Sequence, residues 1–223
     1  MTTGLNPNDV IRARQAIIEA ARQLVAGNVL SRSLHGNISV RLPGTDQFLL
    51  TGSTLKDIGP DDLARLDLYG HVLDGSMDAA SREIVQMHAA VYRRRPDVGA
   101  VIHTHSPHAT AFAIANRPIP PAYEALVRFD FTAPIPVAAY GPRGSERSVS
   151  NIVDVITDDT KVVLLANHGL LAFDQDVTRA VQSVFVLEEA AELIALAEVV
   201  GGARPIPEAL IEETRQRRDA FAG

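Results

Sequence analysis

Three of the seven histidines in this 223-residue chain stand in one short stretch, "VIHTHSPH", which covers residues 101 to 108. In a β-strand, residues i and i+2 project from the same face roughly 6.6 Å apart along the chain, so the imidazoles of His103 and His105 are able to converge on one ion. His108 follows Pro107, which favours a place in the first turn of the next helix. The spacing therefore predicts a metal site on His103 and His105, and it leaves the direction of the His108 side chain open.

A third ligand is expected from a second apolar strand. The segment "KVVLLANHG" is interpreted as a buried strand ending at His168, and loops at strand ends commonly assemble active sites. Three histidines with one open position are typical of a catalytic zinc that acts as a Lewis acid, because structural zinc sites usually fill all four positions. The alternative is that histidines only hydrogen-bond to neighbouring groups, and we retain it for His35, His71 and His88.

Composition restricts what such a site could be. The chain has no cysteine, so a tightly held metal must rely on imidazole and carboxylate, and disulfides and cysteine nucleophiles are excluded. The net charge is -6 and the lysines and arginines are scattered, which is unlike the basic surface of a nucleic-acid-binding protein. We therefore expect a small-molecule partner and no nucleic acid.

Length and hydropathy favour one domain inside the cell. With 46% hydrophobic residues, the chain is expected to form a single domain over residues 1–223. The first ten residues lack the charged and apolar regions of a signal peptide, and the longest aliphatic runs are far too short to span a bilayer. The sequence thus predicts a cytoplasmic protein without a membrane partner.

Helical and strand patterns alternate along the chain, which favours an α/β domain in the broad sense. Apolar residues recur at helical spacing over residues 8–25, with Asn8 as the expected N-cap, and further helices are expected over 81–94, 107–115 and 176–199. Short apolar or β-branched runs predict strands at 37–42, 47–52, 70–75 and 99–105. Three glutamates of the last helix are interpreted as a solvated face: Glu188, Glu189 and Glu192.

Five motifs together resemble one known family. The segments "HGNISVRL", "TGS", "ASREIVQMH", "AVIHTHSPHATAFA" and "NHGLLAF" occur in the order and at the approximate spacing of the class II aldolase/adducin family, over about residues 8 to 200. The resemblance implies a single three-layer α/β domain with a central, mainly antiparallel or mixed β-sheet flanked by helices. The sequence is most similar to the zinc-dependent sugar-phosphate aldolases of that family, of the fuculose-phosphate type.

The resemblance also implies the catalytic groups. It assigns Zn²⁺, with Mn²⁺ or Co²⁺ as substitutes, to His103, His105 and His168, and it makes Glu83 the catalytic acid/base that also occupies the metal's free position. Aldolases of this type use a tyrosine from a neighbouring subunit to handle the proton on the aldehyde oxygen. Tyr123 stands near that position, and an offset of one residue leaves Glu124 as a rival. The family further implies a homotetramer with active sites at subunit interfaces.

The substrate phosphate of such aldolases is held by a Gly-Asn pair, a Thr-Gly turn and a pair of serines. The matching residues here are Gly36, Asn37, Thr51, Gly52, Ser53 and Ser81. Arg82 stands where the second serine is expected. A guanidinium there could bind phosphate more strongly, or it could mark a carboxylate-bearing substrate.

The implied reaction is reversible cleavage of a ketose 1-phosphate to dihydroxyacetone phosphate and an aldehyde. Fuculose, rhamnulose, 5-deoxyribulose and 5-methylthioribulose 1-phosphates all remain open as substrates. Alternatives within the family are dehydration of methylthioribulose 1-phosphate, decarboxylation of an oxo-tetronate phosphate, and 4-epimerisation, although epimerases usually carry aspartate in place of Glu83. A non-catalytic, adducin-like interaction domain is disfavoured because the three histidines and Glu83 are all present.

Overall fold

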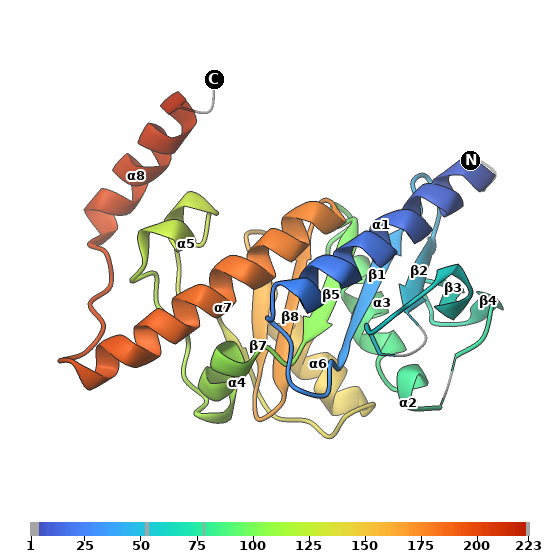
Figure 1. Cartoon of the computed structure of the whole chain (residues 1–223), viewed down its shortest axis with the longest axis horizontal. Helices are drawn as coiled ribbons and strands as arrows, with labels where there is room; N and C mark the ends of the chain where they lie inside the picture. Colours follow the sequence, from blue (N-terminus) through green and yellow to red (C-terminus); the bar gives the residue numbers. More distant parts are fainter. Residues whose placement is uncertain (1–4, 52–53, 78, 222–223) are drawn as a thin grey trace.

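The computed structural model describes residues 5–51, 54–77 and 79–221. Figure 1 shows a central sheet crossed by the two long helices α1 (Pro7–Ala26) and α7 (Val177–Val199), with the C-terminal helix α8 (Glu208–Phe221) beyond the far end of α7. In the part of the chain that the structure describes, the helices fall short of the length or the apolarity that crossing a lipid bilayer requires.

Within the described residues, eight strands form one sheet in the order β4-β3-β2-β1-β5-β8-β7-β6. Neighbouring strands are antiparallel, except that β6 and β7 are parallel. The sheet is therefore mixed and mainly antiparallel, as the resemblance implied. The strands are β1 (Gly36–Arg41), β2 (Gln47–Thr51), β3 (Leu63–Asp67), β4 (Val72–Asp74), β5 (Ala100–Thr104), β6 (Val137–Ala138), β7 (Val162–Leu165) and β8 (Gly169–Asp174).

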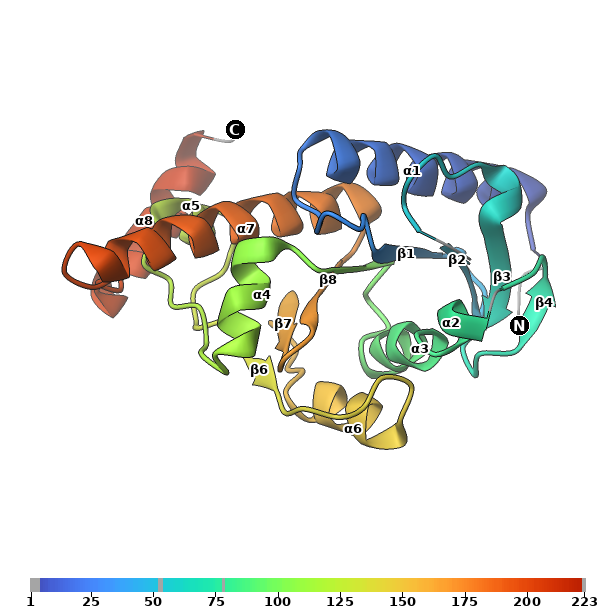
Figure 2. The same ribbon diagram turned by 60° about the horizontal axis from the view of Figure 1, so that its bottom comes forward.

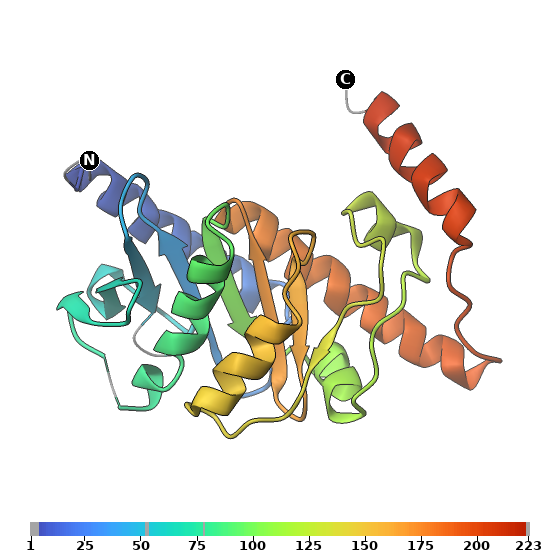
Figure 3. The ribbon, with the colours of Figure 1, turned by 180° about the vertical axis from the view of Figure 1, so that it is seen from behind.

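Helices cover both faces of this sheet. Figure 2 shows α1 and α7 on one side and α3 (Val85–Arg94) and α6 (Glu146–Asp154) on the other, and Figure 3 shows α3 and α6 from behind. The helix α4 (Pro107–Ile114) packs against α7, while α5 (Glu124–Arg128) contacts both α7 and α8. The short elements α2 (Ala79–Arg82) and a 3-10 turn (Pro60–Asp62) complete the described helices.

The two faces of the sheet belong to two separate apolar cores. In β5 and β8, Ile102 and Leu170 pack with α1, α4 and α7, whereas Val101 and Leu171 pack with α3 and α6. Side chains alternate between faces along a strand, and both faces are covered, so these strands are apolar almost throughout. By the same alternation His103 shares the face of Val101, which is the face covered by α3 and α6.

Two element boundaries differ from the sequence prediction in ways that affect the site. The helix expected over 81–94 is interrupted, because α2 ends at Arg82 and α3 begins at Val85, which leaves Glu83 in the turn between them. The strand expected to end at His168 instead ends at Leu165, and a tight turn with Asn167 at a φ of 60° leads directly into β8, which was not predicted. Asparagine tolerates this left-handed conformation better than most residues.

The helix at the N-terminus also begins earlier than expected. Its N-cap is Asn6 rather than Asn8, and the Asn6 side chain accepts a hydrogen bond from the backbone N–H of Asn8 at 3.0 Å. The strands expected at 37–42, 47–52, 70–75 and 99–105 are confirmed as β1, β2, β4 and β5, and the helices at 107–115 and 176–199 as α4 and α7.

A buried hydrogen-bond network ties α3 to the sheet. The hydroxyl oxygen of Ser39 on β1 lies 2.8 Å from Nδ1 of His88 and 2.8 Å from the hydroxyl of Tyr92, and all three residues are buried. Nε2 of His88 is buried without a hydrogen-bond partner among the described residues. Burial lowers the pKa of His88 to about 3, so this imidazole is neutral at physiological pH. His88 was expected to be a hydrogen-bonded histidine, and the contact of its Nδ1 with Ser39 confirms this.

We expect this buried imidazole to make the metal-free protein less stable in acid. Unfolded His88 takes up a proton near its ordinary pKa of 6.5, whereas folded His88 stays neutral down to about pH 3. The unfolded state binds the extra proton between these values, so the free energy of unfolding falls by up to about 1.4 kcal/mol per pH unit from this residue. Denaturant unfolding of His88→Gln and wild type at pH 6 and pH 4, with a chelator present, measures the difference in slope. Equal slopes would contradict a neutral, buried His88.

Candidate metal centre

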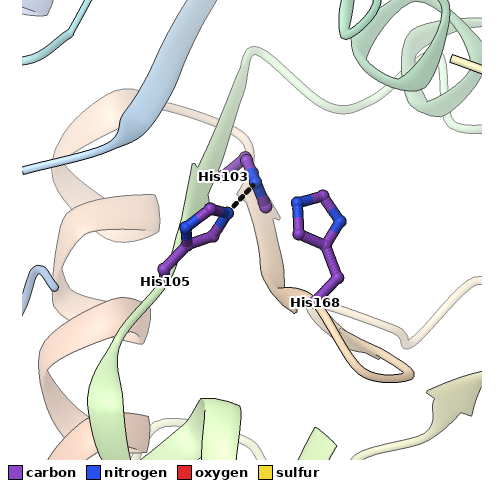
Figure 4. A group of neighbouring side chains, drawn as sticks. All are labelled: His103, His105 and His168. Atoms are coloured by element: carbon purple, nitrogen blue, oxygen red, sulfur yellow. Dashed lines mark hydrogen bonds between the residues drawn. The ribbon is translucent and has the colours of Figure 1, made fainter. Parts of the chain in front are cut away.

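Three histidines from two parts of the chain meet at one edge of the sheet (Figure 4). His103 is on β5, His105 follows the end of that strand, and His168 stands in the turn just before β8. Their ring centroids are 4.7 to 4.9 Å apart, and one ligand atom from each lies within 4.8 Å of the others. The structure thus brings together the three histidines that the sequence analysis assigned to a metal.

One backbone carbonyl fixes which nitrogen of His103 faces the cluster. Nδ1 of His103 lies 2.8 Å from the carbonyl oxygen of Leu170 on the neighbouring strand, and a carbonyl only accepts, so Nδ1 carries the proton. The neutral ring then presents Nε2 as an electron-pair donor. Metal-binding histidines almost always donate their second N–H in this way, which orients the ring and raises its basicity.

The spacing of the nitrogens fits a tetrahedral ion. Nε2 of His103 and Nε2 of His105 are 3.1 Å apart. In a tetrahedral zinc site with Zn–N bonds of about 2.0–2.1 Å, two ligand nitrogens are about 3.3 Å apart. The nitrogens of His103 and His105 are thus already spaced for Zn²⁺, the ligand atom of His168 lies within 4.8 Å of both, and a fourth position is left for a ligand from outside the cluster.

Burial keeps all three imidazoles neutral, which is the state that binds a cation. The pKa of His103 is well below 6.5 because of burial, and His168 and His105 lower it further. Burial also lowers the pKa of His105 to about 4, with added effects from His168, His35 and Arg143. The pKa of His168 is lowered by burial and then by Arg143. No proton has to be displaced at neutral pH before a metal binds.

Gly169 allows β8 to approach the histidines. A Cβ atom at this position would lie 2.5 Å from the backbone oxygen of Thr104 and 2.9 Å from Cδ2 of His105. Gly36 is similarly close on the other side, where a Cβ would lie 2.9 Å from the backbone oxygen of His103. Both contacts are too short for a side chain, so these glycines set the spacing of the strands that carry the ligands.

The histidines line a small polar pocket of about 140 Å³. Its lining also includes His35, Gly36, Asn37, Thr54, Ser81, Ile84 and Arg143. A larger groove of about 750 Å³ lies at the opposite end of the sheet, around the end of β1 and the start of β5, and its described lining contains no histidine. The chemistry of the donor groups, rather than size, identifies the smaller pocket as the candidate site.

Only part of the expected phosphate-binding set lines this pocket. Gly36, Asn37 and Ser81 line it, and Arg82 is exposed outside the described lining. Thr51 is buried at the end of β2, where its hydroxyl accepts a hydrogen bond from the Ile38 N–H at 3.2 Å. Thr54, which follows β2 in the chain, lines the pocket instead. Gly52 and Ser53 lie outside the described residues.

Glu83 is held beside the pocket by an arginine. Nε of Arg143 lies 3.1 Å from a carboxylate oxygen of Glu83, and about half of each side chain is exposed. The Glu83 carboxylate is not among the ligand atoms of the histidine cluster. The entry of Glu83 into the metal's fourth position, which the resemblance implies, therefore requires this side chain to move.

Two residues of the pocket were missed by the sequence analysis. Arg143 stands in a loop before α6, where neither periodicity nor a motif singles it out. His35 was interpreted as an ordinary hydrogen-bonded histidine, but it lines the pocket and its ring lies edge-on to that of His105, with centroids 6.2 Å apart. Its position immediately before Gly36 and Asn37 was the available signal.

His108 lies outside the histidine cluster, in agreement with the ligand set that the resemblance implied, and it has a different role. A carboxylate oxygen of Glu188 accepts a hydrogen bond from the backbone N–H of His108 and lies 2.8 Å from Nδ1 of the same residue, while the second oxygen accepts from the Ala109 N–H. Glu188 thus satisfies the first turn of α4 from α7. Glu189 and Glu192 are exposed, but the prediction of a solvated face is wrong for Glu188, which is 7% exposed.

Tyr123 is not part of the described pocket lining. It is the N-cap residue of α5, and its half-buried side chain packs against the core that contains α1 and α7. In Figure 1 the helix α5 lies beyond the end of the sheet, beside α8, and away from β1. The rival Glu124 is the first residue of α5 and lies outside that lining as well.

Comparison with known proteins also finds aldolases among the proteins similar to this chain. The model of a family described as "Class II Aldolase and Adducin N-terminal domain" matches residues 15–195. A 5-methylthioribulose-1-phosphate/5-deoxyribulose-1-phosphate aldolase of Rhodospirillum rubrum is 34% identical over 188 residues, which cover 83% of this chain and 81% of the relative. An L-fuculose phosphate aldolase of Methanococcus maripaludis is 30% identical over 161 residues, which cover 71% of this chain and 83% of that protein.

A solved structure agrees with this assignment. The structure of an L-fuculose 1-phosphate aldolase matches with a TM-score of 0.80 and 25% identity, covering 93% of this chain and 96% of that one. The similarity extends over nearly the whole of both chains, so the arrangement of sheet and helices described above is that of the matched protein.

We expect the metal site to depend on strand spacing as well as on its ligands. Gly169→Ala should weaken zinc affinity by about 10–100-fold, because its methyl group displaces His105, whereas His103→Ala should abolish stoichiometric binding. Gly59→Ala is the matched control, since a Cβ there meets nothing closer than 3.7 Å. His108→Asn should keep its zinc. Competition with a chromophoric chelator measures each affinity, and an unchanged affinity in Gly169→Ala would refute the spacing argument.

Proposed function

This chain is an enzyme of the class II aldolase and adducin family, and from that premise we propose that it is a zinc-dependent aldolase which cleaves a ketose 1-phosphate to dihydroxyacetone phosphate and an aldehyde. The observation that carries the proposal is the cluster of three neutral imidazoles with an oriented donor nitrogen, beside a carboxylate that is not committed to the cluster. Such a site combines a Lewis acid with an acid/base group.

The residues around the cluster have distinct tasks in this reaction. A bound zinc ion would polarise the substrate carbonyl and so stabilise the negative charge left when the carbon–carbon bond breaks. Asn37 and Ser81 line the pocket and supply neutral hydrogen-bond donors for the phosphate.

Glu83 moves the proton at carbon. Aldol cleavage breaks the bond between C3 and C4 of the ketose, and the electron pair stays on the three-carbon fragment. Glu83 delivers a proton to C3 to complete dihydroxyacetone phosphate, and it removes that proton in the synthetic direction. The hydroxyl proton on C4 leaves as the aldehyde forms, and we assign this second transfer to Tyr123.

Tyr123 reaches the C4 hydroxyl group only if it belongs to a second copy of the chain. It lies outside the pocket lining of its own chain, so the proposal places it in the site of a neighbouring subunit within a homotetramer. The protruding end of α7 supports an interface of this kind, because it exposes several large apolar side chains: Leu193, Leu196, Val199 and Val200.

The relatives narrow the choice of substrate. The Rhodospirillum rubrum relative is named for 5-methylthioribulose and 5-deoxyribulose 1-phosphates, and the Methanococcus maripaludis relative for fuculose phosphate. We propose a pentulose 1-phosphate with a 5-deoxy or 5-methylthio end, because the relative named for such substrates is 34% identical to this chain and the one named for fuculose phosphate is 30% identical.

We expect the zinc-loaded protein to release dihydroxyacetone phosphate from at least one ketose 1-phosphate in a panel of 5-deoxyribulose, 5-methylthioribulose, fuculose and rhamnulose 1-phosphates. Glu83→Gln should lower kcat by about 10²–10⁴-fold because the proton at C3 loses its carrier. A coupled reductase that consumes NADH measures the product. Loss of water or carbon dioxide from a sugar phosphate without this product would replace the proposal with a dehydratase or a decarboxylase.

A subunit-mixing experiment tests the place of Tyr123. Glu83→Gln and Tyr123→Phe should each be nearly inactive alone, because each removes one of the two proton carriers. If Tyr123 acts in the neighbour's site, tetramers mixed from both variants contain some sites with both native residues and recover part of the activity. Light scattering should give four times the chain mass of 24.0 kDa. Mixed tetramers without recovered activity would assign the proton on the aldehyde oxygen to another group.

A further inference from the structure

We propose that Arg143 exchanges partners during the reaction, pairing with Glu83 in the free pocket and with the substrate phosphate when the sugar phosphate binds. The inference rests on the proposed phosphorylated substrate and deepens it, because it names the residue that couples recognition of the phosphate to the availability of the acid/base group. Neither the motifs nor the family resemblance pointed to Arg143.

Arg143 lies in a hydrogen-bonded turn that leads into α6. The Ser145 N–H donates to the carbonyl of Pro142 at 3.0 Å, and Gly144 between them has a φ of 78°. Ser145 is the N-cap of α6, where its side chain accepts from the Ser148 N–H at 3.1 Å. A turn fixed at both ends holds the base of the Arg143 side chain in place, so its movement is confined to the side-chain torsions.

Arg143 lies among the groups that the substrate must contact. It lines the same pocket of about 140 Å³ as the three histidines, Asn37 and Ser81. A sugar phosphate that places its phosphate near Asn37 and Ser81 therefore brings two or more anionic oxygens toward this guanidinium.

The ion pair with Glu83 is weak enough to be exchanged. The side chains of Arg143 and Glu83 are 44% and 51% exposed, and water screens pairs of this kind. A phosphate monoester carries about −1.5 to −2 charges at pH 7, against a single charge on a carboxylate. Guanidinium groups also bind phosphate through two parallel N–H···O bonds. The phosphate is thus the stronger partner once it enters the pocket.

The position of Glu83 in the chain allows its carboxylate to separate from Arg143. Glu83 stands in the break between α2 and α3 and is not within either helix. A Cβ atom on Gly144 would lie 3.2 Å from Cβ of Glu83, so the arginine turn packs directly on the stem of this side chain. When Arg143 turns to the phosphate, the carboxylate of Glu83 is left without this partner and is able to approach the reacting carbon.

The test compares inorganic phosphate binding to zinc-loaded variants by isothermal titration calorimetry at constant ionic strength. Arg143→Met should weaken the Kd for phosphate by about 10–100-fold, and Arg143→Lys should recover part of the loss as a point charge without the planar fork. Arg147→Met is the matched control, because it removes an exposed positive charge on the adjoining helix and lies outside the described lining of the pocket. Its Kd should stay within about twofold of wild type.

A double-mutant cycle tests the exchange itself. Glu83→Gln should tighten phosphate binding by about 2–5-fold when Arg143 is present, because the competing carboxylate is gone. In the Arg143→Met background the same change should have no such effect. An equal effect of Glu83→Gln in both backgrounds would mean that the carboxylate acts only by repulsion, and would overturn the exchange.

Kinetics and a second anion complete the test. Arg143→Met should raise KM for the ketose 1-phosphate in proportion to the change in Kd, whereas an Arg143 that only holds Glu83 in place would lower kcat with KM unchanged. Glycolate in place of phosphate tests a carboxylate ligand. If Arg143→Met weakens glycolate and spares phosphate, or if Arg147→Met weakens phosphate as much as Arg143→Met does, the assignment to phosphate is wrong.

These results separate the two proposals. If no ketose 1-phosphate releases dihydroxyacetone phosphate, the aldolase assignment fails, and the calorimetric cycle still decides the role of Arg143. If cleavage occurs while phosphate affinity is the same in wild type and Arg143→Met, only the exchange is refuted.

Discussion

The pairing of β5 with β1 on one side and with β8 on the other is the constraint from which the site follows. The antiparallel registers place His103 opposite Asn37 and opposite Leu171. The start of β1, the end of β5 and the start of β8 therefore lie at one edge of the sheet. Asn37 lies at the start of β1, His103 and His105 at the end of β5, and His168 just before β8, and all four line the pocket. The bond from His103 Nδ1 to the Leu170 carbonyl spans the same strand pair, so the pairing that assembles the ligands also selects the tautomer that binds metal.

The local part of this arrangement could be predicted from sequence. The interval between His103 and His105 alone indicates a shared strand face, and the apolar segment before His168 indicates a buried strand nearby. The prediction that His168 lies with His103 and His105 is confirmed, but its reasoning was incomplete, since His168 stands in a hairpin turn and precedes β8 rather than ending β7. Periodicity describes one segment at a time, and it does not say which strands become neighbours.

The groups that were missed depend on contacts between elements far apart in the chain. Arg143 enters the pocket because α6 packs on α3, and this places the loop before one helix beside the turn before the other. Glu188 has the spacing of an exposed helical glutamate, yet α4 begins just where this carboxylate is able to cap its first turn. A buried charge is tolerated there because backbone N–H groups and an imidazole satisfy it, which no local pattern reveals.

The charges around the pocket provide an argument for a phosphorylated substrate that does not depend on relatives. Three neutral imidazoles, one carboxylate and one guanidinium carry no net charge together. A divalent cation would raise the total to two positive charges around a pocket of about 140 Å³. A phosphate monoester brings about −1.5 to −2 charges and neutralises this excess, whereas a neutral sugar would leave it uncompensated. The same balance explains why an arginine is tolerated beside a cation site: its charge is matched by Glu83 before the substrate binds, and by the phosphate afterwards.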